Sequence, residues 1–561
     1  MPIKKIYGNV TGLKSSIRQK LQNLYRRKVP KDQLVSYDMA RDLARWSYET
    51  GRQIGCLIGR DGSVEMVIVG DARSVFIPEL PKSREGRSRL RGLRLVHTHI
   101  KGEPLTQDDF MDLVFLRLDC VAAIGVDNHG GPGKIYIAHI FPGRNSTNEN
   151  TPQWVTLPPV PCSDASVNFS ELIESIEEEL ERHRSTMEAR VDSDRALLVA
   201  VTDRDHTDLD SHINEMRELA RAAGIKIVDT VVQRVRKVNP RFLIGKGKLS
   251  EIMVRALQHG VDLLIFDREL NPSQVKALTD ATELRVVDRT QLILDIFAQR
   301  AKSREGKIQV EMAQLRYLMP RLNVRDDALS RLTGGIGARG PGETKLEIDR
   351  RRIKKRLAHL ERALNEIRKN RHEKRRRRNR TEMPVISIIG YTNAGKSTLL
   401  NALTRSDAPV ADQYFATLDP LSRRLRFPKD FEVIVTDTVG FINELPNELL
   451  DAFAATLEEL HDADLLLHVV DVSNPRFEDH IESVRKILRK LDLHNKPELL
   501  VFNKMDRLPS AVARKLADQY GAVAVSAIER STLPPLIYEL EKRVEMICFY
   551  EQFEQKEKES A

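Results

Sequence analysis

The segment Gly390–Ser397, which reads G-Y-T-N-A-G-K-S, constrains this chain more than any other. It fits the phosphate-binding pattern G-x-x-x-x-G-K-[ST] and lies between an apolar, β-branched run at Val385–Ile389 and a helix-forming run at Ser397–Leu403. In that setting backbone N–H groups and a helix N-terminus surround phosphate oxygens. Lys396 would reach the β- and γ-phosphates, and Ser397 would bind Mg²⁺. The segment predicts a parallel α/β sheet that binds a nucleotide.

Later apolar runs end in residues that select the nucleotide. One run ends in Asp437–Gly440, which suits a metal contact and a γ-phosphate contact. Another ends in Asn503-Lys504-Met505-Asp506, an N-K-x-D pattern. The Asp506 carboxylate can accept from guanine N1–H and the exocyclic amino group, and adenine lacks both donors on that edge. A further run leads to Ser526-Ala527, which is placed to contact guanine O6. The order of these signals predicts a GTPase.

Composition points to a nucleic-acid or other anionic partner. The 561-residue chain carries a formal net charge of +9, and its length predicts three or four domains. Arg371–Arg380 is strongly basic and favours an RNA or phosphate contact, with a solvated helix face as the alternative. The four cysteines form no C-x-x-C pair, which indicates a reducing compartment. Without an apolar run of about 18 residues or a signal-peptide core, we expect no membrane span and a cytoplasmic location, including ribosome or membrane surfaces.

Residues 1–160 form the first predicted domain. A strand at Leu93–His97 leads into His97-Thr98-His99, and Thr106-x-x-Asp109 follows. This pattern resembles the metal-binding core of the JAMM/MPN peptidase fold, and His97, His99 and Asp109 could form a three-ligand zinc site. The spacer from His99 to Thr106 is one residue shorter than in that family, and Arg52 stands where its catalytic glutamate would be. Peptidase activity is therefore doubtful, and structural histidines in a binding domain are the alternative.

The middle of the chain predicts a linker, a second sheet and a helical hairpin. The proline-rich stretch Pro152–Pro161 is interpreted as a linker, and an acidic helix is expected at Phe169–Met187. Alternating strands and helices over residues 192–301 predict a parallel sheet. An a/d seam beginning at Leu346 predicts a helix that pairs with Ile308–Leu322. The glycine-rich tip between them, Leu332–Gly342, could contact RNA, and a disordered connector is the alternative.

A set of short segments within residues 191–535 carries a family resemblance. They are Gly245–Lys248, Asn271–Gln274, Asp288–Thr290, Ile293–Phe297, Gln309–Glu311, Gly334–Glu343, Leu346–Arg351, Phe415–Asp419 and Asp437–Phe441. Together they resemble the HflX family of ribosome-associated GTPases. The family's usual G-G-G-I-G is Thr333–Gly337 here, a small departure in the tip. The resemblance implies binding to the large ribosomal subunit and its RNA through the tip and the basic helix, splitting of stalled or idle ribosomes, and release on hydrolysis. Residues 1–190 are an extension that the family lacks.

The motifs and the resemblance together give the predicted site. Thr417 would join Ser397 in binding Mg²⁺ and would sense the γ-phosphate, Asn393 matches an asparagine that binds K⁺ in some related GTPases, and Phe441 replaces a water-orienting glutamine. The predicted catalytic residues are Lys396, Thr417 and Gly440. The predicted nucleotide-binding residues are Gly390, Tyr391, Thr392, Asn393, Ala394, Gly395, Lys396, Ser397, Thr398, Asp437, Thr438, Val439, Gly440, Asn503, Lys504, Asp506, Ser526 and Ala527.

The predicted architecture is α/β: a P-loop GTPase domain preceded by a small parallel-sheet domain with a helical hairpin, plus an N-terminal α+β extension. We expect a monomeric GTP hydrolase that remodels ribosomes; the alternatives are a GTP-dependent switch that recruits proteins through the extension and a GTP-controlled zinc peptidase. The expected domains are an extension at 1–160, a linker helix at 161–190, an α/β domain at 191–302, a hairpin with a basic end at 303–380, the GTPase domain at 381–535 and a tail at 536–561.

Overall fold

The computed structural model describes two compact units. One consists of Met1–Leu209 and Lys226–Val287, and the other of Asp210–Ile225 and Asp288–Ala561. The glycine-rich tip, Thr417 and Val439 lie outside the described residues. No helix within the described ranges is both long and apolar enough to cross a membrane. Those ranges are 5–78, 80, 90–142, 153–164, 168–188, 194–202, 209–235, 239–322, 345–378, 383–404, 421–429, 431–438, 440–442 and 460–560.

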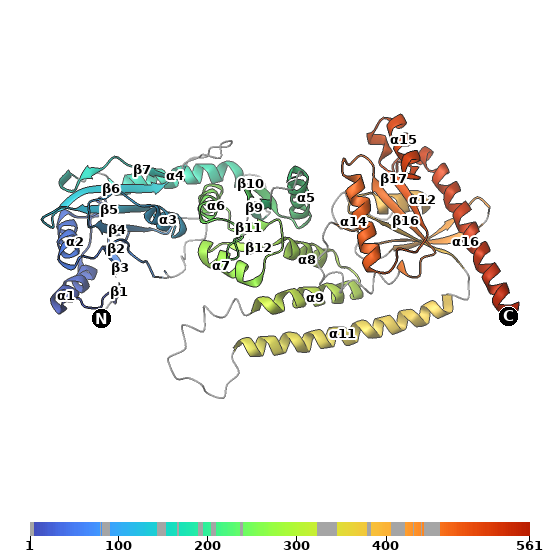
Figure 1. The fold of residues 1–561 in the computed structure, drawn as a ribbon, viewed down its shortest axis with the longest axis horizontal. Coiled ribbons are helices and arrows are strands. Elements are labelled where there is room, and N and C mark those ends of the chain that lie inside the picture. Colours follow the sequence, from blue (N-terminus) through green and yellow to red (C-terminus); the bar gives the residue numbers. More distant parts are fainter. Residues whose placement is uncertain are drawn as a thin grey trace. The chain divides into compact units, whose positions relative to one another are not determined.

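The first unit begins with a mixed sheet in the order β1-β3-β2-β4-β5-β6-β7, with β8 paired to β6 (Figure 1). Strands β2 and β3 form an antiparallel hairpin, and Gly62 has the positive φ (+85°) that its turn requires. The strands are β1 (Ile6–Gly8), β2 (Ile54–Gly59), β3 (Val64–Val69), β4 (Leu93–His99), β5 (Cys120–Val126), β6 (Pro132–Ile140), β7 (Trp154–Thr156) and β8 (Val160–Pro161). The helices are α1 (Ser15–Asn23), η1 (Leu24–Arg26), α2 (Tyr37–Thr50), α3 (Gln107–Phe115), η2 (Cys162–Asp164) and α4 (Phe169–Glu188).

Two expectations for this sheet need correction. The proline-rich stretch is not simply a linker, because β7 and β8 within it both pair with β6. Both strands are short and pair with β6 alone, and such positions at the rim of a sheet tolerate proline because no second neighbour needs its missing N–H. Strand β4 also runs on to His99, so both histidines lie within the strand and not beyond its end.

The second sheet of this unit is parallel throughout, as predicted, in the order β10-β9-β11-β12. Its helix α6 contacts both α3 and α4. The buried apolar side chains of the two sheets form one continuous cluster from Ile6 to Val286. The elements are β9 (Arg195–Thr202), β10 (Lys226–Arg234), α6 (Lys246–His259), β11 (Leu263–Phe266), α7 (Pro272–Thr282) and β12 (Arg285–Val287).

Ion pairs add to this shared core. Glu283 caps the C-terminus of α7 in the left-handed region. Its carboxylate accepts from Arg91 at 2.8 Å and from Arg117, and both arginine side chains are almost fully buried. The extension and the parallel sheet are therefore joined by apolar packing and by charge.

In the second unit the predicted helical hairpin is confirmed. Helices α9 and α11 lie side by side in Figure 1. Between them lies a seam of buried apolar residues, made by Ile308, Met312, Leu357, Leu360 and Leu364. This spacing is what an a/d pattern requires. The helices of this part are α5 (Leu209–Ala222), α8 (Arg289–Arg300), α9 (Arg304–Leu318), η3 (Met319–Arg321) and α11 (Lys345–Arg378).

The second unit also contains a six-stranded sheet in the order β14-β15-β13-β16-β17-β18. Its strands are parallel except β14, which the sequence analysis missed and which pairs antiparallel with β15. The carboxyl ends of the parallel strands share one edge, where ligands of such sheets bind. The strands are β13 (Val385–Gly390), β14 (Leu421–Arg426), β15 (Glu432–Asp437), β16 (Leu465–Asp471), β17 (Glu498–Asn503) and β18 (Val523–Ala524). The helices are α12 (Lys396–Thr404), α14 (Phe477–Lys490), η6 (Met505–Arg507), α15 (Ser510–Tyr520), η7 (Arg530–Thr532) and α16 (Pro534–Ser560).

Candidate functional site

The loop between β13 and α12 is fixed by its glycines and by its neighbours. Gly390 has φ +149°, and a Cβ there would lie 2.1 Å from the Val469 carbonyl oxygen. Gly395 has φ +87°, and a Cβ there would lie 2.3 Å from Asn503 Nδ2. The backbone also pairs with Phe441, whose N–H donates to the Gly390 oxygen at 3.1 Å. Only glycine therefore fits at either position.

Lys396 begins α12 and is buried beneath this loop. Its Nζ donates to the Gly390 oxygen at 3.2 Å and to the Tyr391 oxygen at 2.9 Å. Burial lowers the pKa of Lys396 to about 8, although the charge of Asp437 acts in the opposite direction. The ammonium is thus held at the concave side of the loop, where the oxygens of a bound phosphate would be further hydrogen-bond acceptors.

Ser397 and Asp437 form the polar pair expected at a Mg²⁺ site. Ser397 Oγ donates to Asp437 Oδ2 at 2.6 Å, and Asp437 is fully buried at the end of β15. Mg²⁺ prefers oxygen ligands, and a hydroxyl or carboxylate oxygen can bind the ion directly or accept a hydrogen bond from one of its waters. Thr438 Oγ1 donates to the Ile388 oxygen at 2.7 Å and fixes the strand end. A Cβ at Gly440 would lie 3.0 Å from Lys396 Nζ, so this glycine adjoins the phosphate loop directly.

The predicted base-reading residues come together at the ends of β17 and β18. Asn503 donates from Nδ2 to the Ala394 oxygen at 2.8 Å and accepts at Oδ1 from the Ala527 N–H at 3.0 Å. Asn503 therefore ties the base-reading loops to the phosphate loop. The exposed Asp506 accepts from Ser526 Oγ at 2.6 Å and is open to a ligand.

Lys504 also links the base-reading loop to the phosphate loop, and one of its two partners, Asp471, was not predicted from the sequence. Its Nζ donates to the Asn393 oxygen at 2.7 Å and pairs with Asp471 at 2.8 Å. Asp471 is the last residue of β16 and pairs with Asn503 at the end of β17. An acidic residue that directly follows an apolar run was the sequence signal that could have identified Asp471 as part of the site. Lys504 itself adopts the left-handed region, with φ +62°, which directs the loop back over the phosphate segment.

Phe441 follows Gly440 and is 2% exposed. Its backbone is engaged with the phosphate loop, because its oxygen also accepts from the Thr392 N–H at 2.7 Å. A buried phenyl ring cannot orient an attacking water by hydrogen bonding. The expectation that this position supplies no water-orienting group is consistent with its burial.

Tyr391, the second residue of the loop, is anchored from outside it. Its hydroxyl donates to Glu215 Oε2 on α5 at 3.0 Å, and its ring stacks on His480 with centroids 3.8 Å apart. Glu215 also pairs with Arg289 of α8 at 2.7 Å, and both side chains are mostly buried. These partners come from distant parts of the sequence, and no local pattern predicts them.

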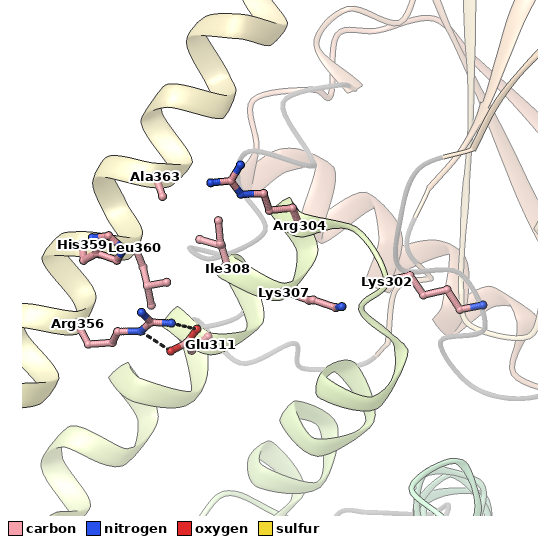
Figure 2. A pocket seen from close by; sticks show the side chains of 9 residues that line it. All are labelled: Lys302, Arg304, Lys307, Ile308, Glu311, Arg356, His359, Leu360 and Ala363. Atoms are coloured by element: carbon pink, nitrogen blue, oxygen red, sulfur yellow. Dashed lines mark hydrogen bonds and ion pairs between the residues drawn. The ribbon is translucent and has the colours of Figure 1, made fainter.

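A basic groove lies between α9 and α11 (Figure 2). It has a volume of about 440 Å³ and carries four cationic side chains against one carboxylate, Glu311, which Arg356 binds through two hydrogen bonds. The groove therefore favours an anion. Its lining residues are Lys302, Arg304, Lys307, Ile308, Glu311, Arg356, His359, Leu360 and Ala363.

In the N-terminal sheet the three predicted metal ligands do come together. One ligand atom from each of His97, His99 and Asp109 lies within 4.8 Å of the others, and both histidines are buried. Arg52 donates instead to the Asn9 oxygen at 2.7 Å.

The parallel sheet, the glycine loop with its buried lysine, the Ser397–Asp437 pair and the N-K-x-D loop define a P-loop GTPase. Three family comparisons agree with this class. Residues 210–298 match the family described as GTP-binding GTPase N-terminal, residues 300–378 match GTP-binding GTPase Middle Region, and residues 385–504 match 50S ribosome-binding GTPase.

Curated relatives then identify the family. GTPase HflX of Caldanaerobacter subterraneus subsp. tengcongensis is 47% identical over 362 residues, which cover 64% of this chain and 83% of the relative. GTPase HflX of Escherichia coli K12 is 41% identical over 357 residues, 63% of this chain and 83% of that one. A GTP-binding protein from Sulfolobus solfataricus, solved with GDP, is similar at 24% identity and a TM-score of 0.36, covering 62% of this chain and 99% of that one. This chain belongs to the HflX family and is a GTPase.

Proposed function

We propose that this GTPase binds the large ribosomal subunit and dissociates stalled or idle ribosomes. The observation that carries the proposal is the match of its catalytic domain to the 50S ribosome-binding GTPases. The buried Phe441 supports it, because a phenylalanine at this position cannot orient the attacking water and an activating surface could supply that orientation.

In the proposed reaction the chain contributes positioning and charge. Lys396 and the loop amides hold the β- and γ-phosphates, and the Gly440 N–H meets the γ-phosphate. Ser397 and Thr417 would hold Mg²⁺, which would neutralise charge on the phosphate oxygens. Asp437 orients Ser397 through the hydrogen bond already present, and its carboxylate would accept from a water on the metal. Asp506 selects guanine.

The basic groove supplies a second support, for contact with RNA. Arg304 and Lys307 of α9 both line the groove, and in Figure 2 the Arg304 side chain extends toward α11; neither forms an ion pair with another described residue. Clustered cations bind nucleic acid by releasing counterions, so such binding weakens steeply with salt. We propose that this groove and the basic end of α11 follow the phosphate backbone of ribosomal RNA.

K⁺ is proposed as an activating ion at Asn393. This residue is exposed, has φ +61°, and its backbone oxygen is fixed by Lys504. Exchange of K⁺ for Na⁺ in the turnover assay below tests the assignment, and equal rates in both salts would remove it.

The test is GTP turnover of the full chain with and without purified large ribosomal subunits, in K⁺ buffer. We expect strong stimulation, since an external group that completes such a site can raise the rate by about 10³–10⁵. The double variant Arg304→Ala/Lys307→Ala should keep basal turnover and bind subunits more weakly, with a shallower salt dependence.

Lys515→Ala on α15 serves as the matched control, because it removes an exposed cation elsewhere in the unit. Unchanged turnover with subunits present, while GTP still binds, would contradict the ribosomal proposal. That outcome would favour the second candidate, a GTP-dependent switch that recruits protein partners through residues 1–160.

A further inference from the structure

The GTPase function leaves one cluster of buried polar groups in the N-terminal sheet unexplained. His97 and His99 are two residues apart on β4 and therefore face the same side of the sheet. Asp109, from the first turn of α3, faces them: His97 Nε2 and His99 Nε2 are 2.9 Å apart, and they lie 3.1 and 3.5 Å from the Asp109 carboxylate oxygens. Three ligand atoms thus converge on one point.

The separations are those of side chains gathered around one small site. Zinc binds imidazole nitrogen at about 2.0–2.1 Å and carboxylate oxygen at about 2.0–2.2 Å, so neighbouring ligand atoms of a tetrahedron lie about 3.3–3.5 Å apart. Each imidazole Nε2 lies within 3.5 Å of one Asp109 oxygen, His97 near Oδ1 and His99 near Oδ2, and one ligand atom from each residue lies within 4.8 Å of the others. Two imidazoles and a carboxylate fill three positions and leave the fourth open.

Outer partners hold two of the ligands in place. His99 Nδ1 lies 2.9 Å from the Glu103 oxygen, and donation there leaves Nε2 with its lone pair toward the site. Asp109 is fixed by the capping box of α3, in which it accepts from the Thr106 N–H at 2.6 Å and from the Thr106 hydroxyl at 2.8 Å. Hydrogen bonds of this kind orient ligands at metal centres.

A second, independent observation comes from β2. Gly55 pairs directly with His97, so Gln53, two residues earlier, lies on the same face opposite His99. Its side chain is 1% exposed, and among the described residues Nε2 has no hydrogen-bond partner. A buried amide without a partner is costly, and an oxygen ligand in the open position would satisfy it.

We propose that His97, His99 and Asp109 bind one Zn²⁺, and that the Gln53 amide donates to an oxygen-donor ligand, a water or a carboxylate, in the fourth position. This site is separate from the GTPase reaction. Gln53 is neutral and cannot serve as a general base, and Arg52 is directed to Asn9. Neither residue supplies the general base of a metallopeptidase, and we assign the site as a binding centre for oxygen ligands.

Metal content of the purified full chain tests the ligand set. We expect about one zinc per chain in the wild type, and less than a tenth of that in His97→Ala and His99→Ala. His139→Ala is the matched control, because His139 is also buried in this sheet but binds the Ile140 oxygen away from the cluster. Circular dichroism and thermal unfolding, measured in parallel, show whether each variant is folded, because the GTP site lies in the other unit and does not report on this sheet.

Cobalt tests the role of Gln53. Co²⁺ in the emptied site should give the intense visible bands of four-coordination, and acetate should change them. Gln53→Leu should retain one Co²⁺ per chain but bind acetate about tenfold more weakly, since it removes a charge-assisted hydrogen bond. A wild-type chain that neither contains nor takes up zinc, or a loss of zinc in His139→Ala equal to that in His97→Ala, would overturn the site. Unchanged acetate binding in Gln53→Leu would overturn the role given to the amide.

Discussion

At the scale of single residues, Asp506 offers the sharpest test of nucleotide choice. Replacement by Asn should weaken GTP binding by a factor on the order of 10²–10⁴, because two hydrogen bonds to a charged acceptor are lost. Xanthine carries an oxygen where guanine carries its amino group, and the new amide can donate to it. We therefore expect Asp506→Asn to prefer XTP, as measured by competition binding.

A matched variant separates this effect from a general loss of charge. Asp518→Asn removes an exposed carboxylate from α15 and should leave GTP affinity unchanged. Wild-type GTP affinity in Asp506→Asn would show that the base-reading assignment is wrong.

Lys396 predicts a pH dependence of nucleotide affinity. Its pKa is lowered to about 8 in the nucleotide-free protein, and bound phosphates would restore the charged form. Above pH 8 binding must take up a proton, so GDP affinity should fall by up to about tenfold per pH unit, and between pH 7 and 7.5 it should be nearly flat. Calorimetry in two buffers with different ionisation enthalpies measures that uptake directly; no uptake at pH 9 would contradict the shift.

Individual residues also show where sequence reasoning ends. The phosphate loop and N-K-x-D pattern were recognisable because each motif is contiguous. The tie from Asn503 to Ala394 and Ala527, and the position of Gln53 opposite His99, depend on strand register. Register is set by pairing between strands that are distant in sequence, so a local pattern does not contain it.

At the scale of elements, α5 and α8 hold the phosphate loop through Tyr391. We expect Tyr391→Phe, which keeps the ring stacked on His480, to weaken GDP binding several-fold, because a hydrogen bond to the charged Glu215 is lost and the loop is less well ordered. Glu215→Gln should do the same. If the contact acts as a unit, the double variant should be little worse than either single one, measured with a fluorescent GDP analogue.

Tyr520→Phe is the control for this cycle, since it removes a hydroxyl bonded to the exposed Glu478. Full additivity of Tyr391→Phe and Glu215→Gln would show that the two side chains act independently.

The elements themselves were largely predictable. The strands β13, β15, β16 and β17 are continuous apolar runs, and the α9–α11 seam repeats every seven residues. Strands β7, β8 and β14 were not predicted, because they are short or rich in arginine and exist by pairing with an edge.

At the scale of the whole molecule, the match to GTPase HflX of Caldanaerobacter subterraneus covers 64% of the chain, so the role of the N-terminal extension has to be argued from its own structure. The structure shows that the extension shares its apolar core with the parallel sheet of the first unit. A length-based expectation of independent domains could not foresee this, because packing of α6 against α3 and α4 depends on surfaces that only the folded chain presents.

Arg91 and Arg117 form ion pairs with Glu283 where the extension meets the parallel sheet. Removing the extension would therefore leave the Glu283 carboxylate without these partners, and it would also expose apolar side chains. A fragment trimmed to the length of its bacterial relatives would keep α6 but lose the surface that covers it. Such a fragment would expose an apolar surface to water and would be prone to aggregate. The extension and the parallel sheet therefore form one compact unit, and neither part has a complete surface without the other.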